Sequence, residues 1–317
     1  MIINSVQTYI DVQNRVDPTR TTALRNAFAG AMNKRFLELL VVIKRAIVTE
    51  DVFGLKSPIH ILQMTTPGER AFAFTRSSAK IEAFMRWLQE QVDRGLLDIR
   101  VYEQIGASIE SSWMNLYIYD SYKRGVIRAR YEMRKAGMQI PTIDESGGIE
   151  MVMATPFHMD RVGVLFTRVF TELKGITDQM SSLISKILSQ GMIDGDGAAL
   201  LTRKLIAAIN GAGVGDLGLT DSLGRFMPAT RRATILARTE LIRAHHLATI
   251  QEYRNWAVEG IKVQGEWKTA GDERVCTACE SMEGRIFTLA EIEPLIPLHP
   301  QCRCIALPYI KELEKYK

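Results

Sequence analysis

Hydrophobic residues recur at helical spacing through most of the first half of the chain. In residues 19–48 they fall every three or four positions and so define one face of an amphipathic helix: Leu24, Phe28, Met32, Phe36, Leu39, Leu40 and Ile43. The Asp17-Pro18 pair is a typical start signal for this helix. Further helical patterns cover 68–97 and about 107–136. The pattern predicts an N-terminal arm at 1–20 and a helical domain at 21–140.

Residues 141–155 form the best candidate for a linker between two domains. This stretch contains a proline and two neighbouring glycines, which interrupt helices and strands. We therefore expect a second domain at 156–308 and a C-terminal tail at 309–317.

The second domain begins with the pattern of a long helix. Thr155 supplies a cap, Pro156 occupies the first turn, and Gly191 is expected to end the helix. Between them apolar residues repeat in steps of three or four: Leu165, Val169, Leu173, Ile176, Met180, Ile184 and Ile187. Helices at 196–209 and 228–260 follow, separated by a glycine-rich surface loop.

Two short segments near the C-terminal end carry the pattern of strands. Residues 261–270 alternate between apolar and polar side chains, and 284–289 form a candidate partner strand. These segments predict a small antiparallel sheet around the cysteine-rich region of the chain.

Composition places the chain among ordinary globular proteins. Hydrophobic residues make up 46% and charged residues 24% of the 317 positions, which suffices for a real core. The net charge of +4 permits contact with nucleic acid or an acidic partner without requiring it. The most apolar run, 37–43, is far shorter than the ~20 residues that cross a bilayer, and we find no secretory signal. We therefore expect a reducing cytoplasm, where cysteines more often bind metal than form disulfides.

All four cysteines lie within 29 residues near the C-terminal end of the chain, together with one histidine. The residues Cys276, Cys279, His299, Cys302 and Cys304 follow the pattern C-x2-C-x19-H-x2-C-x-C. Zinc takes four such ligands in tetrahedral geometry, so four of these five would hold it. Spacing leaves open whether Cys304 replaces His299 or Cys302. Zinc is favoured over an iron–sulfur cluster because the set mixes thiolates with imidazole. The alternative is a set of labile thiols beside a packed histidine.

The order of these residues favours a structural metal site over a catalytic one. Nucleobase deaminases carry H-x-E before P-C-x-x-C, whereas here the histidine follows the first cysteine pair and Pro300 and Gln301 follow it. We predict a structural zinc clip at 276–304 that fastens the C-terminal tail to the small sheet. The fold class is then α+β and mostly α-helical, with a helical N-terminal domain followed by long helices packed with a small antiparallel sheet.

A cluster of cations lies at the end of the third predicted helix. One acid, Glu132, accompanies six basic residues: Lys123, Arg124, Arg128, Arg130, Arg134 and Lys135. A solvated helix end is one interpretation, because cations are favourable near a helix C-terminus. The other interpretation is a contact surface for DNA or an acidic partner.

Other candidate residues point to packing rather than chemistry. His245 and His246 lie about 100° apart on a helix, so we expect one to be packed and one to be solvated. His60 and His158 are isolated, and residues 238–243 form an intrahelical charge lattice. The sequence lacks a Ser-His-Asp order, a nucleophile elbow and a phosphate loop, so we predict no enzyme activity.

Several short motifs of the second domain occur in a distinctive order. They are "ARTE" at 237–240, Trp267 with "KTAGDERVC", the C-x2-C pair, Gly284 before a hydrophobic strand, and "HPQCRC" at 299–304 followed by Pro308. In this order and spacing they resemble the phage Mu F-like head morphogenesis family, the minor head proteins of tailed bacteriophages. The resemblance spans roughly 155–308.

This resemblance implies a role rather than a chemistry. Members are low-copy head components that associate with the portal vertex and act in procapsid assembly, DNA packaging or DNA delivery. For this chain it implies a virion protein, made in the host cytoplasm and present in several copies. Its implied partners are the portal protein and the major capsid protein, with packaged double-stranded DNA as a further candidate and no membrane.

Two other classes of function stay open at this point. Some head proteins of this type carry a fused enzyme or toxin-like effector domain, although 1–150 lacks a cluster of site-like residues. A zinc-ribbon nucleic-acid-binding protein is the second, and it predicts sequence-selective binding through the C-terminal region alone.

Overall fold

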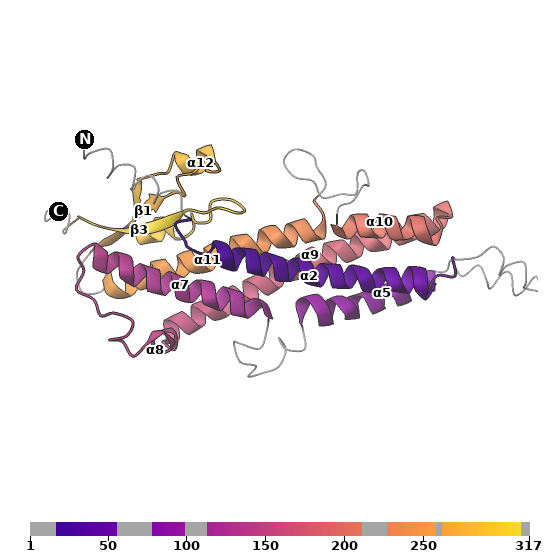
Figure 1. Ribbon diagram of the computed structural model, residues 1–317, viewed down its shortest axis with the longest axis horizontal. Coiled ribbons are helices and arrows are strands. Elements are labelled where there is room, and N and C mark those ends of the chain that lie inside the picture. The colour runs from indigo at the N-terminus through magenta and orange to yellow at the C-terminus, as the bar shows by residue number, and fades with distance from the viewer. Residues whose placement is uncertain (1–16, 56–77, 99–112, 211–226, 258–261, 312–317) are drawn as a thin grey trace, which may run out of the picture. The chain divides into compact units, whose positions relative to one another are not determined.

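The computed structural model describes residues 17–55, 78–98, 113–210, 227–257 and 262–311 (Figure 1). The helices in these ranges are α2 (Thr22–Lys44), η1 (Arg45–Thr49), α5 (Ser78–Val92), η2 (Asp93–Leu97), α7 (Trp113–Lys135), α8 (Ile149–Met153), α9 (Pro156–Asp194), α10 (Ala198–Asn210), α11 (Ala229–Ala257), α12 (Thr277–Glu280) and α13 (Leu289–Ile292). The strands are β1 (Val263–Lys268), β2 (Ile286–Phe287) and β3 (Ile305–Ile310). The predicted α+β class with mostly helical content is confirmed. No described helix is long and apolar enough to span a bilayer.

The chain divides into two compact units. Unit 1 comprises Met1–Ala29, Ser108–Val169 and Ile235–Lys317, and unit 2 comprises Gly30–Ala107 and Phe170–Thr234. Each unit takes residues from both sides of 141–155, and the domain boundaries placed there stay a prediction. The glycine-rich loop at 211–224, His60 and residues 1–16 of the predicted arm at 1–20 lie outside the described residues.

Gly191 does not end the long helix, contrary to the sequence-based expectation. Helix α9 continues to Asp194, and Gly195 follows with a left-handed φ of 77°. A Cβ at Gly191 would lie 2.8 Å from the Leu201 side chain and 2.9 Å from Asp196 Oδ2. The glycine therefore allows close approach of the next segment, and Gly195 supplies the helix-ending conformation.

Thr155 does not cap the start of α9 with its side chain, contrary to the sequence-based expectation. The hydroxyl of Thr155 donates backwards to Val152 O at 2.7 Å, so the side chain does not cap the helix. Its backbone carbonyl instead accepts hydrogen bonds from His158 N at 3.0 Å and Met159 N at 3.1 Å.

The small sheet has the strand order β2-β1-β3 and is antiparallel throughout. Gly265 of β1 lies opposite Phe287 on one side and Pro308 on the other. The pairing of 261–270 with 284–289 is confirmed. Strand β3 was missed, because Pro308 breaks the strand pattern. The proline is tolerated because, among the strands that the structure describes, β3 pairs with β1 alone.

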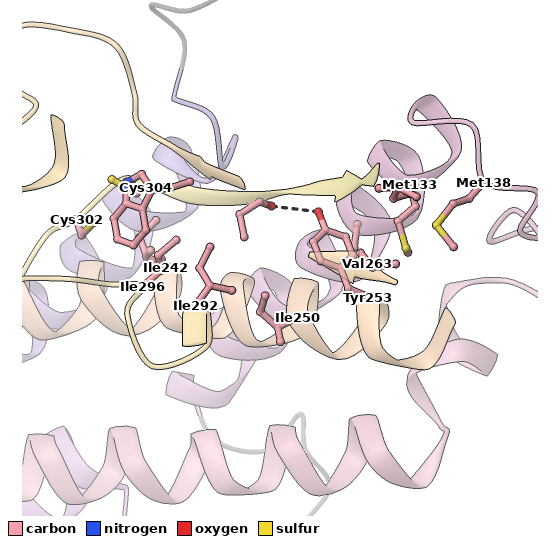
Figure 2. Close-up of a cluster of buried hydrophobic side chains, with 14 of the residues drawn as sticks. Met133, Met138, Ile242, Ile250, Tyr253, Val263, Ile292, Ile296, Cys302 and Cys304 are labelled. Atoms are coloured by element: carbon pink, nitrogen blue, oxygen red, sulfur yellow. Dashed lines mark hydrogen bonds between the residues drawn. The ribbon is translucent and has the colours of Figure 1, made fainter. Parts of the chain in front are cut away.

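A hydrophobic cluster fills the space between this sheet and helix α11 (Figure 2). Trp267 of β1 is fully buried in it, and the Tyr253 hydroxyl donates a hydrogen bond to Ala306 O at 3.1 Å. Cys302 and Cys304 belong to the same cluster. The cysteine-rich segment is therefore anchored to the core of unit 1.

Helix α7 packs against α11 with little space between the backbones. A Cβ at Gly125 would lie 2.3 Å from the backbone oxygen of His245. Nearby, the Ser121 hydroxyl donates to Leu241 O at 2.7 Å. Both His245 and His246 are only 2% exposed, so the expectation that one would be solvated is wrong. The reason is that other elements cover this part of α11: Gly125 of α7 meets the His245 backbone, and Ile292 of α13 meets His246.

His158 is not isolated but lies in a buried polar network. Its Nδ1 is 2.9 Å from the Tyr122 hydroxyl, and its Nε2 is 2.8 Å from Glu252 Oε1. The second carboxylate oxygen, Oε2, accepts hydrogen bonds from Arg130 Nε at 2.9 Å and Trp256 Nε1 at 3.0 Å. The network ties α7, α9 and α11 together, and its polar groups satisfy one another, as burial requires.

Candidate metal centre

The first cysteine pair is presented by a single helical turn. Cys276 is the N-cap of α12, and its sulfur accepts a hydrogen bond from Cys279 N at 3.4 Å. This turn directs two sulfur atoms to the same side, as the C-x2-C pattern predicts. Cys276 is exposed and Cys279 is buried, so the pair spans the surface and the core.

The histidine and the second cysteine pair approach from the other side. His299 Nε2 lies 3.3 Å from Cys276 Sγ and 3.2 Å from Cys279 Sγ. His299 Nδ1 is 2.8 Å from Pro300 O, and a proton there leaves the Nε2 lone pair free for a metal ion. The Cys279 and Cys302 sulfur atoms are 3.8 Å apart.

The cluster comprises two overlapping sets of three ligands. Cys276, Cys279 and His299 form one set, and Cys279, Cys302 and Cys304 form the other, with ligand atoms in each within 4.8 Å of one another. With Zn–S bonds of 2.3 Å, tetrahedral geometry puts sulfur atoms roughly 3.8 Å apart. The distances from His299 Nε2 to the sulfur atoms of Cys276 and Cys279, and between the sulfur atoms of Cys279 and Cys302, are close to the ligand–ligand distances of such a tetrahedron. The donor set thus fits a tetrahedral ion, with Cys304 as a fifth ligand within reach.

The cysteines differ in how readily they lose a proton. A hydrogen bond with Cys304 lowers the pKa of Cys302 to about 5, and one from the Cys279 backbone lowers the pKa of Cys276. Burial raises the pKa of Cys279 to about 12. The site therefore offers the Cys302 thiolate at neutral pH, and a bound cation would displace protons from the other thiols.

An ion pair next to the cluster fastens the loop before α12 to the last cysteines. Arg303 donates two hydrogen bonds to Asp272, at 2.6 and 2.5 Å, and they hold the pKa of Asp272 well below its usual range. On the neighbouring turn, Glu283 accepts from Thr269 N at 2.6 Å and pairs with Lys268. These contacts were not predicted, although the acid in "GDER" and the arginine between the last cysteines were visible in the sequence.

The "ARTE" and "HPQCRC" motifs contact each other directly. Arg238 donates to Gln301 Oε1 at 3.1 Å, and Gln301 N donates to Thr239 Oγ1 at 3.0 Å. Gln301 adopts a left-handed φ of 62° in this turn. The predicted charge lattice is present as the Arg243–Glu240 pair at 3.2 Å. The first motif therefore positions the turn that carries His299.

A second set of ion pairs joins α9 and α11 to the end of α13. Glu293 accepts a hydrogen bond from Arg161 of α9 at 2.8 Å and two from Arg254 of α11, at 2.9 and 2.5 Å. These arginines together lower the pKa of Glu293 despite its partial burial.

Two of the six cations on α7 face inward. Arg130 is 6% exposed and is paired with Glu252. Arg128 pairs with Glu132 at 2.7 Å and donates to Pro18 O at 2.8 Å. Both guanidinium groups hold parts of unit 1 together.

The other four cations lie closer to solvent. Lys123 pairs with Glu150 at 3.2 Å, and Arg124 pairs with Asp120 at 3.1 Å. Arg134 donates to Ile140 O at 2.5 Å. Arg124, Arg134 and Lys135 are exposed, as is the ring of Tyr131, which is 57% exposed.

The fold and the cluster together define a mostly helical α+β protein with a small antiparallel sheet and a Cys/His group that can hold a metal ion. Among known families, the one described as Phage Mu protein F like protein matches residues 183–307. The predicted resemblance is thus confirmed: the chain is similar to this family over 183–307, which is less than half of its length. The match begins later than the predicted 155. No curated protein and no solved structure matches the chain.

Proposed function

We propose that this protein is a structural minor head protein of a tailed bacteriophage and associates with the portal vertex. The observation that carries the proposal is the family match over 183–307, which contains the motifs that converge around the Cys/His cluster. Contacts with the portal and major capsid proteins, and a role in head assembly, DNA packaging or DNA delivery, belong to the same proposal. The same proposal gives the metal site a structural rather than a catalytic role, because five protein ligands are available for the four positions around the ion.

The composition of purified virions tests this role. Quantitative mass spectrometry should find the protein at a few copies per virion, and affinity purification from infected cells should recover the portal protein with it. Focused cryo-electron microscopy of the vertex would then locate it. Absence from purified heads, together with normal assembly when the gene is deleted, would refute the proposal.

We also infer that the Cys/His cluster holds one structural zinc ion. Support comes from the mixed sulfur and imidazole donors, the Cys279–Cys302 sulfur separation, and the position of His299 Nε2 beside both sulfur atoms of the first pair. Zinc would cross-link α12 to the turn at 299–304. Inductively coupled plasma mass spectrometry of the full chain should find about one equivalent of zinc. Cys276→Ser should lower that content, whereas the neighbouring Thr277→Ser should not. A wild-type protein without stoichiometric metal would end the inference.

Cobalt substitution would identify the four ligands. The intensity of the sulfur-to-cobalt charge-transfer band reports the number of bound thiolates. Replacing Cys304 should leave this band unchanged if Cys276, Cys279, His299 and Cys302 hold the ion.

The exposed cations of α7 are the third part of the proposal. Arg124, Arg134 and Lys135 lie with Tyr131 on the exposed side of the helix, and we propose that they contact packaged DNA or an acidic capsid surface. Lys123 lies beside this group, whereas Arg128 and Arg130 are committed to contacts within unit 1.

A further inference from the structure

The ion pair between Asp272 and Arg303 joins the two segments of the chain that carry the metal ligands. Asp272 lies in the loop that leads into Cys276. Arg303 lies between the last two cysteines, Cys302 and Cys304. The groups of converging ligand atoms in the described part of the chain include neither Asp272 nor Arg303. The pair can therefore act on the ligands without binding the ion itself.

The contact between the two side chains is bidentate. Arg303 Nη1 donates to Asp272 Oδ2 at 2.6 Å, and Arg303 Nη2 donates to Asp272 Oδ1 at 2.5 Å. Two parallel hydrogen bonds between a guanidinium and a carboxylate fix the orientation of both groups as well as their distance. The side chains of Arg303 and Asp272 are 15% and 16% exposed, so solvent and salt screen the pair less than they screen a surface pair.

Asp272 also shapes the turn that leads into the first cysteine pair. Arg274 N donates to Asp272 Oδ1 at 3.1 Å, and Val275 N donates to the backbone oxygen of Asp272 at 3.0 Å. Cys276 follows directly as the N-cap of α12. One carboxylate thus contacts both the backbone just before the first ligand and the arginine between the last two cysteines.

This arrangement bears on metal affinity because the ligands come from separate segments. An ion that binds both segments has to bring them together and order them, which costs free energy. Contacts that already hold the ligands near their bound positions reduce this cost and so increase affinity. The bidentate pair makes such a contact between the loop before Cys276 and the turn at 299–304.

We infer that Asp272, acting through Arg303, positions the two ligand-bearing segments and thereby controls how tightly the Cys/His cluster holds its metal ion. Asp272 is a positioning residue and not a ligand. The inference rests on the zinc site proposed above. Loss of an outer contact of a metal site typically costs 10–100-fold in affinity. We expect about tenfold here, because the pair acts on the ligands through the backbone.

Competition between the full chain and a chromophoric zinc chelator, at constant pH, measures this effect. Asp272→Asn keeps the side-chain shape but removes the charge, and Arg303→Lys keeps the charge but removes the fork. Each should weaken zinc binding about tenfold. The double variant should bind no more weakly than either single variant, because both substitutions remove the same contact.

Arg274→Ala is the matched control within the same loop. Arg274 Nη2 also donates to Asp272, at 3.1 Å, but its side chain is 75% exposed. This variant loses one cation and leaves the Arg303 contact in place, so its zinc affinity should equal that of the wild type.

Cobalt spectra separate positioning from loss of a ligand. At saturating cobalt, Asp272→Asn should show the sulfur-to-cobalt band at wild-type intensity, because the same sulfur atoms bind the ion. Circular dichroism checks that each variant is folded, and Arg303→Lys tests the same contact if Asp272→Asn is not. A wild type that takes no zinc from the chelator would refute the zinc site itself. A wild type that binds zinc, with Asp272→Asn and Arg303→Lys binding it equally tightly, would overturn the role of Asp272 alone. Additive losses in the double variant would also overturn it.

Discussion

Gly125 marks the closest approach between α7 and α11. Because an added Cβ would meet the His245 backbone oxygen at 2.3 Å and Ala248 Cβ at 2.7 Å, Gly125→Ala should force the helices apart. Overpacking of this kind costs about 1–3 kcal/mol, and a backbone neighbour cannot rotate away. Urea denaturation should therefore show a lower free energy of unfolding.

Gly163→Ala is the matched control for this substitution. Gly163 is exposed in α9, and an added Cβ would meet no atom within 4 Å. Alanine should stabilise the helix there by about 0.5–1 kcal/mol. Equal stability of the two variants would contradict the packing described for α7 and α11.

The buried histidines of α11 should make the protein sensitive to acid. Burial lowers the pKa of His245 to about 3 and that of His246 to about 4, and Arg128 further disfavours a charge on His245. In the unfolded chain both pKa values are near 6.5. Between pH 6.5 and 4 the unfolded state therefore binds more protons, so the free energy of unfolding falls as pH falls. The expected slope is about 1.4 kcal/mol per pH unit for each histidine.

Urea denaturation at pH 7.5, 6 and 5 measures this slope. His246→Gln retains a donor for Ile292 O, which His246 Nε2 approaches at 3.1 Å, and removes one titrating group. Its slope should be about half that of the wild type. A wild-type stability that is the same at pH 7.5 and pH 5 would show that the histidines do not behave as their burial implies.

At the scale of elements, the Arg130–Glu252 pair holds α7 against α11. Both side chains are buried, and Arg130→Ala would leave the Glu252 carboxylate without its charged partner. Breaking a buried pair in this way costs about 3–5 kcal/mol. The exposed Arg124–Asp120 pair is the control, and Arg124→Ala should change stability by roughly 0.5 kcal/mol or less. Thermal unfolding should separate the two variants clearly, and similar midpoints would argue against the buried network.

The metal clip should hold the small sheet and its loops rather than the helices. The cluster joins α12 to the turn at 299–304, so chelation or Cys276→Ser should loosen residues 265–308. Hydrogen–deuterium exchange should then become faster in these residues and stay unchanged in α2 and α5. Identical exchange before and after metal removal would show that Asp272, Arg303 and the hydrophobic cluster hold this segment without a metal ion.

For the whole molecule, the exposed cations of α7 predict salt-dependent DNA binding. The triple variant Arg124→Ala, Arg134→Ala and Lys135→Ala should reduce the slope of log affinity against log salt by about 2.7, or roughly 0.9 for each lost phosphate contact. This variant avoids Arg130, whose loss would destabilise the fold.

A second triple variant separates a local contact from a general effect of charge. Arg86, Lys186 and Arg203 are exposed cations of unit 2, and their replacement by alanine changes the net charge equally. Fluorescence anisotropy with a DNA duplex should show little change in slope for this variant. Equal slopes for the wild type and the α7 variant would remove DNA as a partner of α7.

The features that the sequence determined by itself arise from residues close together along the chain. The period of the apolar residues predicted α2 and α9, because burial of one helix face repeats every three to four residues. Alternation predicted β1 and its pairing with β2. The spacing of the cysteines and His299 predicted a common site, since a C-x2-C turn directs both sulfur atoms to one side.

Only the tertiary structure decided those features that depend on contacts between residues far apart in the sequence. Arg130 is neutralised by Glu252, and Arg303 by Asp272, although neither pair is close in sequence. Gly191 lies inside α9, where the absence of a side chain leaves room for Leu201 and Asp196. Both histidines of α11 are buried because residues of α7 and α13 cover them. A periodic pattern shows that a face is buried, whereas the identity of the covering residue depends on contacts that only the folded chain brings together.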